Sequence, residues 1–274
     1  MRCLVSRNLV SYTETSPRPA SPYALRSLGR GLLLLERFVG SPRGLTLTEL
    51  APGLGWGKAT AFRYLSARVG AGYLELDAAS RRYRPTVRVL RLGGAYLASL
   101  SLPDLAAPFL ERLSSAFGES VNMAVLDETE VVYVARVSGP RILSTRLAVG
   151  SRLPAHATSM GKVLLAHQGE AEQRRLLSLS AFERLTPKTV ASASRMRGVL
   201  AAVRRRGYAV NDQELDLGLR SCAAPVFDRR GAAVAAVNLS TSSARTTLAD
   251  VEGKHVPAVV ATAGAISEVL KTRY

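Results

Sequence analysis

Two short amphipathic segments and a basic hairpin follow one another within residues 45–85. The first segment opens with the Thr-x-x-Glu pattern of Thr46 and Glu49, a capping box in which each side chain binds a free backbone N–H at a helix start. Gly53 and Gly55 end this helix, and the apolar spacing predicts a second helix over residues 58–69. A helix, a short glycine-containing turn and a second helix predict a helix-turn-helix unit.

A basic hairpin is predicted after the second helix, with strands at residues 73–76 and 81–84 around a turn at residues 77–80. Together these elements form a winged helix-turn-helix, whose second helix enters the DNA major groove while the hairpin lies over phosphates. The competing interpretation is a small helical subdomain with a solvated hairpin. The predicted DNA contacts are Lys58, Thr60, Phe62 and Arg63 on the helix and Arg81, Arg82 and Arg84 on the hairpin.

The net charge favours a polyanionic partner. The chain carries +16 at pH 7, and residues 1–100 hold 15 Lys and Arg against 5 Asp and Glu, so the excess is concentrated in the N-terminal third. A basic N-terminal domain is what phosphate binding requires. An organism whose proteins are all rich in arginine would give the same total charge, and this alternative stays open.

Three other features of the composition narrow the class of protein. Cys3 and Cys222 form no disulfide framework, which predicts a reducing, cytoplasmic location. The three histidines lack the spacing of metal ligands, so we expect no metal and no cofactor. No apolar run approaches the roughly 20 residues that a membrane span needs, so we expect no membrane partner.

The chain divides into four segments. Residues 1–22 are rich in Ser, Pro and Arg, and we interpret them as a disordered tail or a gene start placed too far upstream. Residues 23–85 form the DNA-binding head. Residues 86–102 predict a linker helix that pairs with its copy in a dimer, with an ordinary connecting helix as the alternative. Residues 103–274 form an α+β domain.

Apolar periodicity predicts the remaining elements. The head begins with a helix over residues 23–39, whose packing face is expected to consist of Leu25, Leu28, Leu32, Leu35 and Val39. In the second domain the expected helices span residues 104–117, 160–167, 171–179, 192–206 and 248–270, the last bent at Pro257. The expected strands span residues 121–126, 131–137, 142–147, 208–210, 222–227 and 232–239.

Polar residues mark a candidate ligand site in the second domain. Thr158 and Ser159 precede a helix, where their hydroxyls and the free N–H groups of residues 160–162 form either a seat for an anion or an ordinary N-cap. A second polar stretch covers residues 208–221. Asn238 and Ser240 share one face of the last strand, which indicates either a lined cavity or a hydrogen-bonded strand end.

An enzyme is the alternative from a different class, either a hydrolase or a small-molecule-binding enzyme with an incidental basic head. Residues 157–161 match Ala-x-Ser-x-Gly, a variant of the hydrolase nucleophile elbow, with His156 and Asp212 as the other members of a triad around Ser159. That elbow requires a strand running directly into the serine, which the sequence does not predict. Cys222 lies in an apolar run, and a buried cysteine is ordinarily inert.

Residues 153–166, 207–214 and 217–226 resemble the isocitrate-lyase-regulator (IclR) family of transcription factors. The resemblance covers the chain from Tyr23 onward and is closest to the branch that controls aromatic-acid catabolism through the β-ketoadipate pathway. It implies a GAF-like effector domain that binds a small organic or aromatic acid, and a homodimer or dimer of dimers on a palindromic promoter. The implied effector contacts are Ser159, Met160, Asn211, Ser221, Asn238 and Ser240.

The head departs from this family's pattern at four positions. Pro52 stands inside the first helix of the motif, where a proline costs about 3 kcal/mol unless it falls in the first turn. Gly57 replaces the usual Ser or Asn cap, which costs about a few tenths of a kcal/mol. Arg68 and Ala71 stand where leucines are usual, and an arginine there must extend its charged end to solvent or leave the core.

Overall fold

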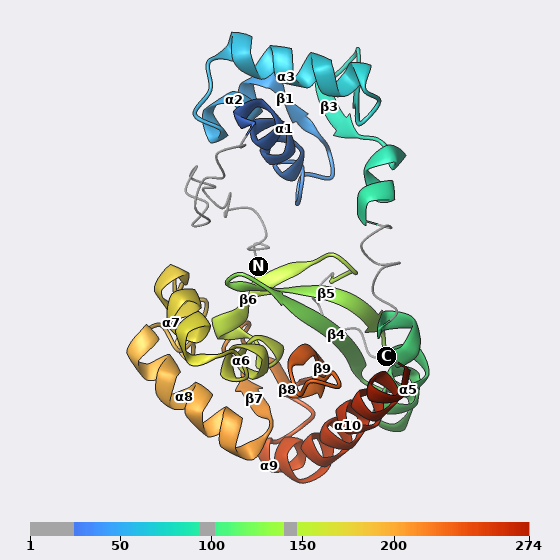
Figure 1. Cartoon of the computed structure of the whole chain (residues 1–274), viewed down its shortest axis with the longest axis vertical. Coiled ribbons are helices and arrows are strands. Elements are labelled where there is room, and N and C mark those ends of the chain that lie inside the picture. Colours follow the sequence, from blue (N-terminus) through green and yellow to red (C-terminus); the bar gives the residue numbers. More distant parts are fainter. Residues whose placement is uncertain (1–24, 94–101, 140–146, 274) are drawn as a thin grey trace. The chain divides into compact units, whose positions relative to one another are not determined.

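The structure is a computed structural model that describes residues 25–93, 102–139 and 147–273. The chain divides into two compact units, Met1–Ser99 and Leu100–Tyr274 (Figure 1). Each unit has its own hydrophobic core. The predicted tail at residues 1–22 lies outside the described residues, as does the predicted strand at 142–147 except for Leu147. In the predicted linker helix, residues 87–89 form a 3-10 turn and residues 90–93 are helical, and residues 94–101 lie outside the described part.

The first unit is the winged helix-turn-helix that the sequence predicts. A three-stranded antiparallel sheet in the order β1-β3-β2 accompanies three helices. Buried apolar side chains from the helices and strands form one core, among them Leu34, Leu50, Leu65 and Tyr83. The elements are α1 (Arg26–Glu36), β1 (Leu45–Thr46), α2 (Leu47–Gly53), α3 (Lys58–Gly70), β2 (Leu74–Leu76) and β3 (Arg82–Pro85).

The helix starts in the head follow the sequence closely. The capping box of α2 is confirmed, because the Glu49 N–H donates to Thr46 Oγ1 at 3.3 Å and the Thr46 N–H donates to Glu49 Oε2 at 2.7 Å. Pro52 lies inside α2, but the helix ends one residue later, so its missing N–H affects only the last turn. Gly57 caps α3 without a side-chain hydrogen bond, as expected.

The buried face of α1 differs from the predicted one. Gly31 and Leu34 are the buried residues of this helix. Of the predicted packing residues only Leu35 packs against the core, while Leu25, Leu28, Leu32 and Val39 are exposed. On the buried face of α1 the Arg68 guanidinium of α3 lies over Gly31, and a Cβ added there would come within 1.6 Å of it. Gly31 has no side chain, so the Arg68 guanidinium fits against the backbone of α1.

The second unit is an α+β domain built on one antiparallel sheet. Its six strands have the order β6-β5-β4-β9-β8-β7. The hairpin predicted around residues 127–130 joins β4 to β5. The strands are β4 (Ser120–Asp127), β5 (Glu130–Val137), β6 (Arg152–Pro154), β7 (Ala209–Asp212), β8 (Leu219–Phe227) and β9 (Ala233–Ser242).

Helices cover both faces of this sheet (Figure 1). On one face α5 (Leu102–Phe117) and α10 (Val256–Arg273) pack against alternate strand residues such as Val121, Val237 and Leu239. On the other, α6 (Ser159–Ala166), α7 (Glu170–Leu179) and α8 (Ala193–Arg206) pack against residues such as Ala223 and Ala236.

The C-terminal helical segment is interrupted before Pro257 rather than bent at it. A short helix α9 (Leu248–Asp250) is followed by a π-helical turn, η3 (Val251–His255), and α10 begins at Val256. Proline has no N–H to donate to the carbonyl four residues earlier, so a wider turn just before it is a common accommodation. The expected break is therefore present but lies one turn earlier.

Candidate functional site

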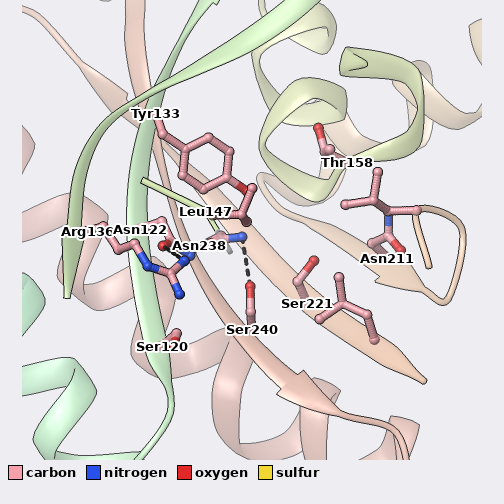
Figure 2. Close-up of a pocket in the computed structure, with 12 residues that line it drawn as sticks. Ser120, Asn122, Tyr133, Arg136, Leu147, Thr158, Asn211, Ser221, Asn238 and Ser240 are labelled. Atoms are coloured by element: carbon pink, nitrogen blue, oxygen red, sulfur yellow. Dashed lines mark hydrogen bonds between the residues drawn. The ribbon is translucent and has the colours of Figure 1, made fainter. Parts of the chain in front are cut away.

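A small cavity lies on the sheet face that α6 covers (Figure 2). Its volume of about 20 Å³ leaves room for one or two water molecules. Strands from the middle of the sheet supply most of the lining, and the connections before α6 and between β7 and β8 close it. The lining residues are Ser120, Asn122, Tyr133, Arg136, Leu147, Thr158, Asn211, Leu215, Leu219, Ser221, Asn238 and Ser240.

Strand register brings four of the polar side chains together. Ser120 pairs with Ser240, and Asn122 pairs with Asn238, across β4 and β9. Residues directly opposite in an antiparallel pair share a face, so all four face α6 while their apolar neighbours enter the opposite core. The Asn122 Nδ2 donates to Asn238 Oδ1 at 2.8 Å, and the Asn238 Nδ2 donates to Ser240 Oγ at 3.2 Å.

Arg136 brings a positive charge to this group. It pairs with Asn122 across β4 and β5, and its Nη1 donates to Asn122 Oδ1 at 3.0 Å. Among the described residues that line the cavity, Arg136 is the only charged one. Its guanidinium therefore binds an amide and no carboxylate within the cavity. A half-buried cation in such surroundings attracts an anionic ligand.

Tyr133 lies beside Arg136 and is almost completely buried. Burial raises the pKa of the Tyr133 phenol to about 12, against the opposing effect of the Arg136 charge. The phenol therefore stays protonated at neutral pH, and its hydroxyl can donate a hydrogen bond to a ligand.

A second polar group lies on the other side of the cavity, where Figure 2 shows Thr158, Asn211 and Ser221 apart from Asn122 and Arg136. The Asn211 side chain donates to the Ala157 carbonyl and accepts from the Glu214 N–H at 3.0 Å. The Ser221 hydroxyl lies 2.8 Å from that of Ser159. Ser221 pairs with Ser240 across β8 and β9 and with Asn211 across β7 and β8, so the polar residues form one continuous row that crosses the sheet from β4 to β7.

The six predicted effector contacts are placed in three ways. Asn211, Ser221, Asn238 and Ser240 line the cavity. Ser159 lies behind the lining, bonded to Ser221, and Met160 is fully buried in the core around α6. Their contacts with an effector stay predictions.

Sequence reasoning missed the other polar lining residues, namely Ser120, Asn122, Tyr133 and Arg136. A signal was available, because Asn122 and Arg136 interrupt otherwise apolar strands. An interruption of that kind by itself does not show which residues of different strands meet.

The segment before α6 is an N-cap rather than an anion seat. Thr158 Oγ1 accepts from the Gly161 N–H at 3.0 Å, and the Lys162 N–H donates to the Thr158 carbonyl at 3.1 Å. Two of the donors that would hold an anion are therefore already bonded. The alternative of a plain threonine cap is the one that the structure contains.

The three residues considered for a hydrolase triad do not form one. His156 Nε2 lies 3.0 Å from the Glu183 carbonyl, and the Asp212 carboxylate binds Lys188 and Arg220. Ser159 binds Ser221 instead of either. Cys222 is buried, and burial raises the pKa of its thiol to about 12, so it does not form a thiolate at neutral pH.

The predicted DNA-contacting residues of the head lie on α3 and on the hairpin, with Arg81 just before β3. Lys58, Phe62 and Arg63 are exposed on α3, where Phe62 is 51% exposed, and Thr60 is half-buried. Arg81 and Arg84 are exposed on the hairpin. These positions leave α3 with an exposed face of the mixed basic and apolar kind that base-edge readout uses.

Arg82 has a role inside the head that the sequence did not reveal. Its guanidinium binds both Glu49 oxygens, at 3.0 and 3.1 Å, and the Gly44 carbonyl at 2.8 Å. It therefore joins β3 to the capping box of α2. A direct contact of Arg82 with DNA stays a prediction.

The described part of the chain contains neither a cluster of metal-binding side chains nor a helix that could span a membrane. No group of three or more His, Cys, Asp or Glu side chains there is arranged to hold a metal ion. None of the helices in residues 25–93, 102–139 and 147–273 has the length and apolar character needed to span a bilayer.

Both units of the chain match known domain families. Residues 27–78 match the IclR helix-turn-helix domain, and residues 94–268 match the C-terminal domain of bacterial IclR transcriptional regulators. The Pca regulon regulatory protein of Pseudomonas putida is 36% identical over 241 residues, which cover 88% of this chain and 82% of the relative. The p-hydroxybenzoate hydroxylase transcriptional activator of Acinetobacter baylyi is 36% identical over 226 residues, covering 81% of this chain and 83% of that protein.

Solved structures agree with this match. A crystal structure of an IclR family transcriptional regulator from Brucella abortus has a TM-score of 0.78 and 27% identity, over 93% of this chain and 96% of the other. An IclR homologue from Microbacterium hydrocarbonoxydans, complexed with 4-hydroxybenzoate, has a TM-score of 0.74 and 27% identity, over 89% of this chain and 98% of the other.

Proposed function

Because this chain belongs to the IclR family of bacterial transcriptional regulators, we propose that its regulation depends on an aromatic carboxylate bound in the cavity beside α6. The observation that carries this proposal is Arg136. It is a cation in a lining that, within the described residues, contains no acidic side chain. A carboxylate there would gain a charge-assisted hydrogen bond without displacing a carboxylate of the protein.

The rest of the lining fits an aromatic acid. The carboxylate would bind Arg136, and the ring would lie between the apolar side chains of Leu215, Leu219 and Tyr133. A ring hydroxyl would reach the polar group around Ser221. Two relatives support an acid of this size and polarity. One is named as a p-hydroxybenzoate hydroxylase transcriptional activator, and the other is the IclR homologue complexed with 4-hydroxybenzoate.

The small cavity volume suggests how binding acts on the rest of the protein. A ring of benzoate size does not fit into about 20 Å³, so side chains or strands must move as it enters. An effector shifts a conformational equilibrium only by the difference in its affinity for the two states. The proposed regulation is that the effector-bound conformation acts through the linker helix to change the spacing of two heads.

This mechanism requires the wider arrangement that the sequence predicts. We place the head at residues 23–85, the linker helix at 86–102 and the effector domain at 103–274. The active form would be a homodimer or dimer of dimers in the cytoplasm, bound to a palindromic promoter. In each head α3 would enter the major groove through Lys58, Thr60, Phe62 and Arg63, with Arg81, Arg82 and Arg84 near the phosphate backbone.

We propose no catalytic role for the effector domain. The relatives with assigned functions named above are transcriptional regulators. The side chains considered for a hydrolase triad bind other partners, and the buried Cys222 stays a thiol. Release of product from 4-nitrophenyl esters at a rate above the buffer blank, lost in Ser159→Ala, would contradict this view.

Isothermal titration of the purified protein with benzoate, 4-hydroxybenzoate and the neutral benzamide tests the carboxylate site. We expect the acids to bind, benzamide to bind more weakly, and Arg136→Met to weaken acid binding by about ten- to a hundred-fold, the value of one hydrogen bond to a charged group. Arg152→Met is the matched control, because the Arg152 guanidinium binds Asp127 and Glu130 at the sheet edge.

Equal affinity of the parent and Arg136→Met for both acids would contradict the proposed site. A gel-shift assay with a promoter fragment, with and without the acid, then tests the link to DNA. We expect the acid to change the affinity of the parent for DNA and to have no effect on Arg136→Met at the same concentration.

A further inference from the structure

A buried ion pair lies next to the cavity, between α6 and the connection from β7 to β8. The Lys162 side chain is 2% exposed, and its Nζ binds Oε1 of Glu214, whose side chain is 12% exposed. Burial lowers the pKa of Lys162, although the Glu214 carboxylate acts in the opposite direction. Taking two charges out of water costs free energy that their attraction does not reliably return. The pair is therefore a poor choice for stability alone.

Glu214 is held by more than this pair. Its N–H donates to Asn211 Oδ1 at 3.0 Å, and its carbonyl accepts from Thr189 Oγ1 at 2.6 Å. Its second carboxylate oxygen accepts from the Val190 N–H at 3.4 Å. Asn211 in turn donates to the Ala157 carbonyl just before α6. These bonds place Glu214 at the centre of a network that joins α6, β7 and the loop before α8.

The segment that this network holds has an unfavourable backbone conformation. Gln213 has a φ of +63°, in the left-handed region that residues other than glycine seldom adopt. Such conformations persist where neighbouring contacts enforce them, and they occur often at ligand sites. Asn211 on one side of Gln213 and Leu215 on the other both line the cavity. The Lys162–Glu214 pair thus holds a segment with a strained residue, Gln213, and this segment contributes Asn211 and Leu215 to the cavity lining.

We propose that the Lys162–Glu214 pair is a positioning device for the effector site, which holds Asn211 and Leu215 against the cavity and sets effector affinity without touching the effector. This inference rests on the proposed function of the cavity as an acid-binding site. It predicts that the pair matters more for ligand affinity than for folding.

Hydrogen–deuterium exchange on the full chain without ligand tests the positioning directly. Glu214→Leu is expected to increase exchange across residues 211–219. The control is Leu176→Ala, which removes a buried side chain of α7 in the same core without touching the pair. If Glu214→Leu does not fold, Glu214→Gln is measured instead. Exchange at 211–219 no faster than in Leu176→Ala overturns the proposal.

The double variant Lys162→Met/Glu214→Leu separates positioning from stability. It leaves no unpaired buried charge, so its melting temperature should return close to that of the parent. Its affinity for the acid should stay about ten-fold weaker, which corresponds to about one lost hydrogen bond. If affinity recovers together with the melting temperature, the pair is merely structural and the proposal fails.

The two proposals fail in different ways. If the parent binds neither benzoate nor 4-hydroxybenzoate, or if Arg136→Met binds them as well as the parent does, the carboxylate site is wrong. The exchange experiment needs no ligand and still decides whether the pair holds residues 211–219. If acid binding depends on Arg136 and the double variant binds as tightly as the parent, only the positioning proposal is overturned.

Discussion

Two glycine-to-alanine substitutions in the effector domain are expected to have opposite effects on its stability. Both glycines lie inside helices, Gly161 in α6 and Gly264 in α10. A Cβ on Gly161 would lie 2.2 Å from the carbonyl oxygen and 2.3 Å from the Cα of Ala155. A Cβ on Gly264 meets nothing within 4 Å. The backbone approach at Gly161 therefore distinguishes two substitutions that look alike in the sequence.

The expected magnitudes follow from these distances. Alanine in a helix interior is favoured over glycine by about 1 kcal/mol, so Gly264→Ala should stabilise the domain by up to that amount. At position 161 the added methyl lies more than 1 Å too close to backbone atoms, which no side-chain rotation can relieve. Overpacking costs about 1–3 kcal/mol or more. After the helix-propensity gain of up to about 1 kcal/mol, we expect Gly161→Ala to destabilise the domain by up to about 2 kcal/mol.

Urea unfolding with two probes measures both effects. The chain has a single tryptophan, Trp56, which lies in the head, so its fluorescence reports that unit while far-ultraviolet circular dichroism reports both. With a slope of about 1–3 kcal/mol per M, Gly161→Ala should lower the midpoint of the dichroism transition by up to about 1 M and leave the Trp56 transition unchanged. A midpoint for Gly161→Ala at or above that of Gly264→Ala would refute the close approach of α6 to Ala155.

Two predictions concern the head. Arg63→Ala should relax the preference for particular sequences in a binding assay over operator variants. Arg84→Ala should weaken binding to all sequences and reduce the slope of log affinity against log salt concentration by about one. If both variants bind as the parent does, neither residue contacts DNA. The pKa of Glu49 is lowered, chiefly by its hydrogen bond to the Thr46 backbone and further by Arg82. Its contribution to stability is therefore present above the ordinary Glu pKa of about 4.3 and is lost as pH falls through the lower folded value. Trp56-detected unfolding between neutral pH and pH 3 should show this loss in the parent and a flatter profile in Glu49→Gln, and equal profiles would count against it.

The head was predictable because its signals are local. The capping box of Thr46 and Glu49, the glycines after α2 and the turn after β2 all act within a few residues, so the sequence alone indicates them. The buried face of α1 was not predictable in this way. The core receives Leu34 and Leu35, and the Arg68 guanidinium of α3 lies over Gly31; neither contact is visible in the sequence of α1 alone.

The cavity was only half predictable for a similar reason. Asn238 and Ser240 interrupt an apolar strand at alternate positions, which is visible in the sequence. Arg136 meets Asn122 only through the pairing of β4 with β5, in which a bulge between Met123 and Ala124 shifts the register. β6 was missed because it is a three-residue edge strand that ends in Pro154, a residue that ordinarily argues against a strand.

Side chains along β4 and β9 point alternately to the two faces of the sheet, and this has a consequence for how regulators of this kind acquire new specificities. Val121, Val237 and Leu239 enter the core beneath α5 and α10, while Asn122, Asn238 and others face the opposite way. Under the proposed function, substituting a polar residue on the α6 face should change which acid binds without altering the core beneath α5 and α10. Inserting or deleting one residue in either strand would exchange the two faces and destroy both at once. New specificities should therefore arise in this scaffold by point substitution, and changes in strand length should be rare among functional descendants.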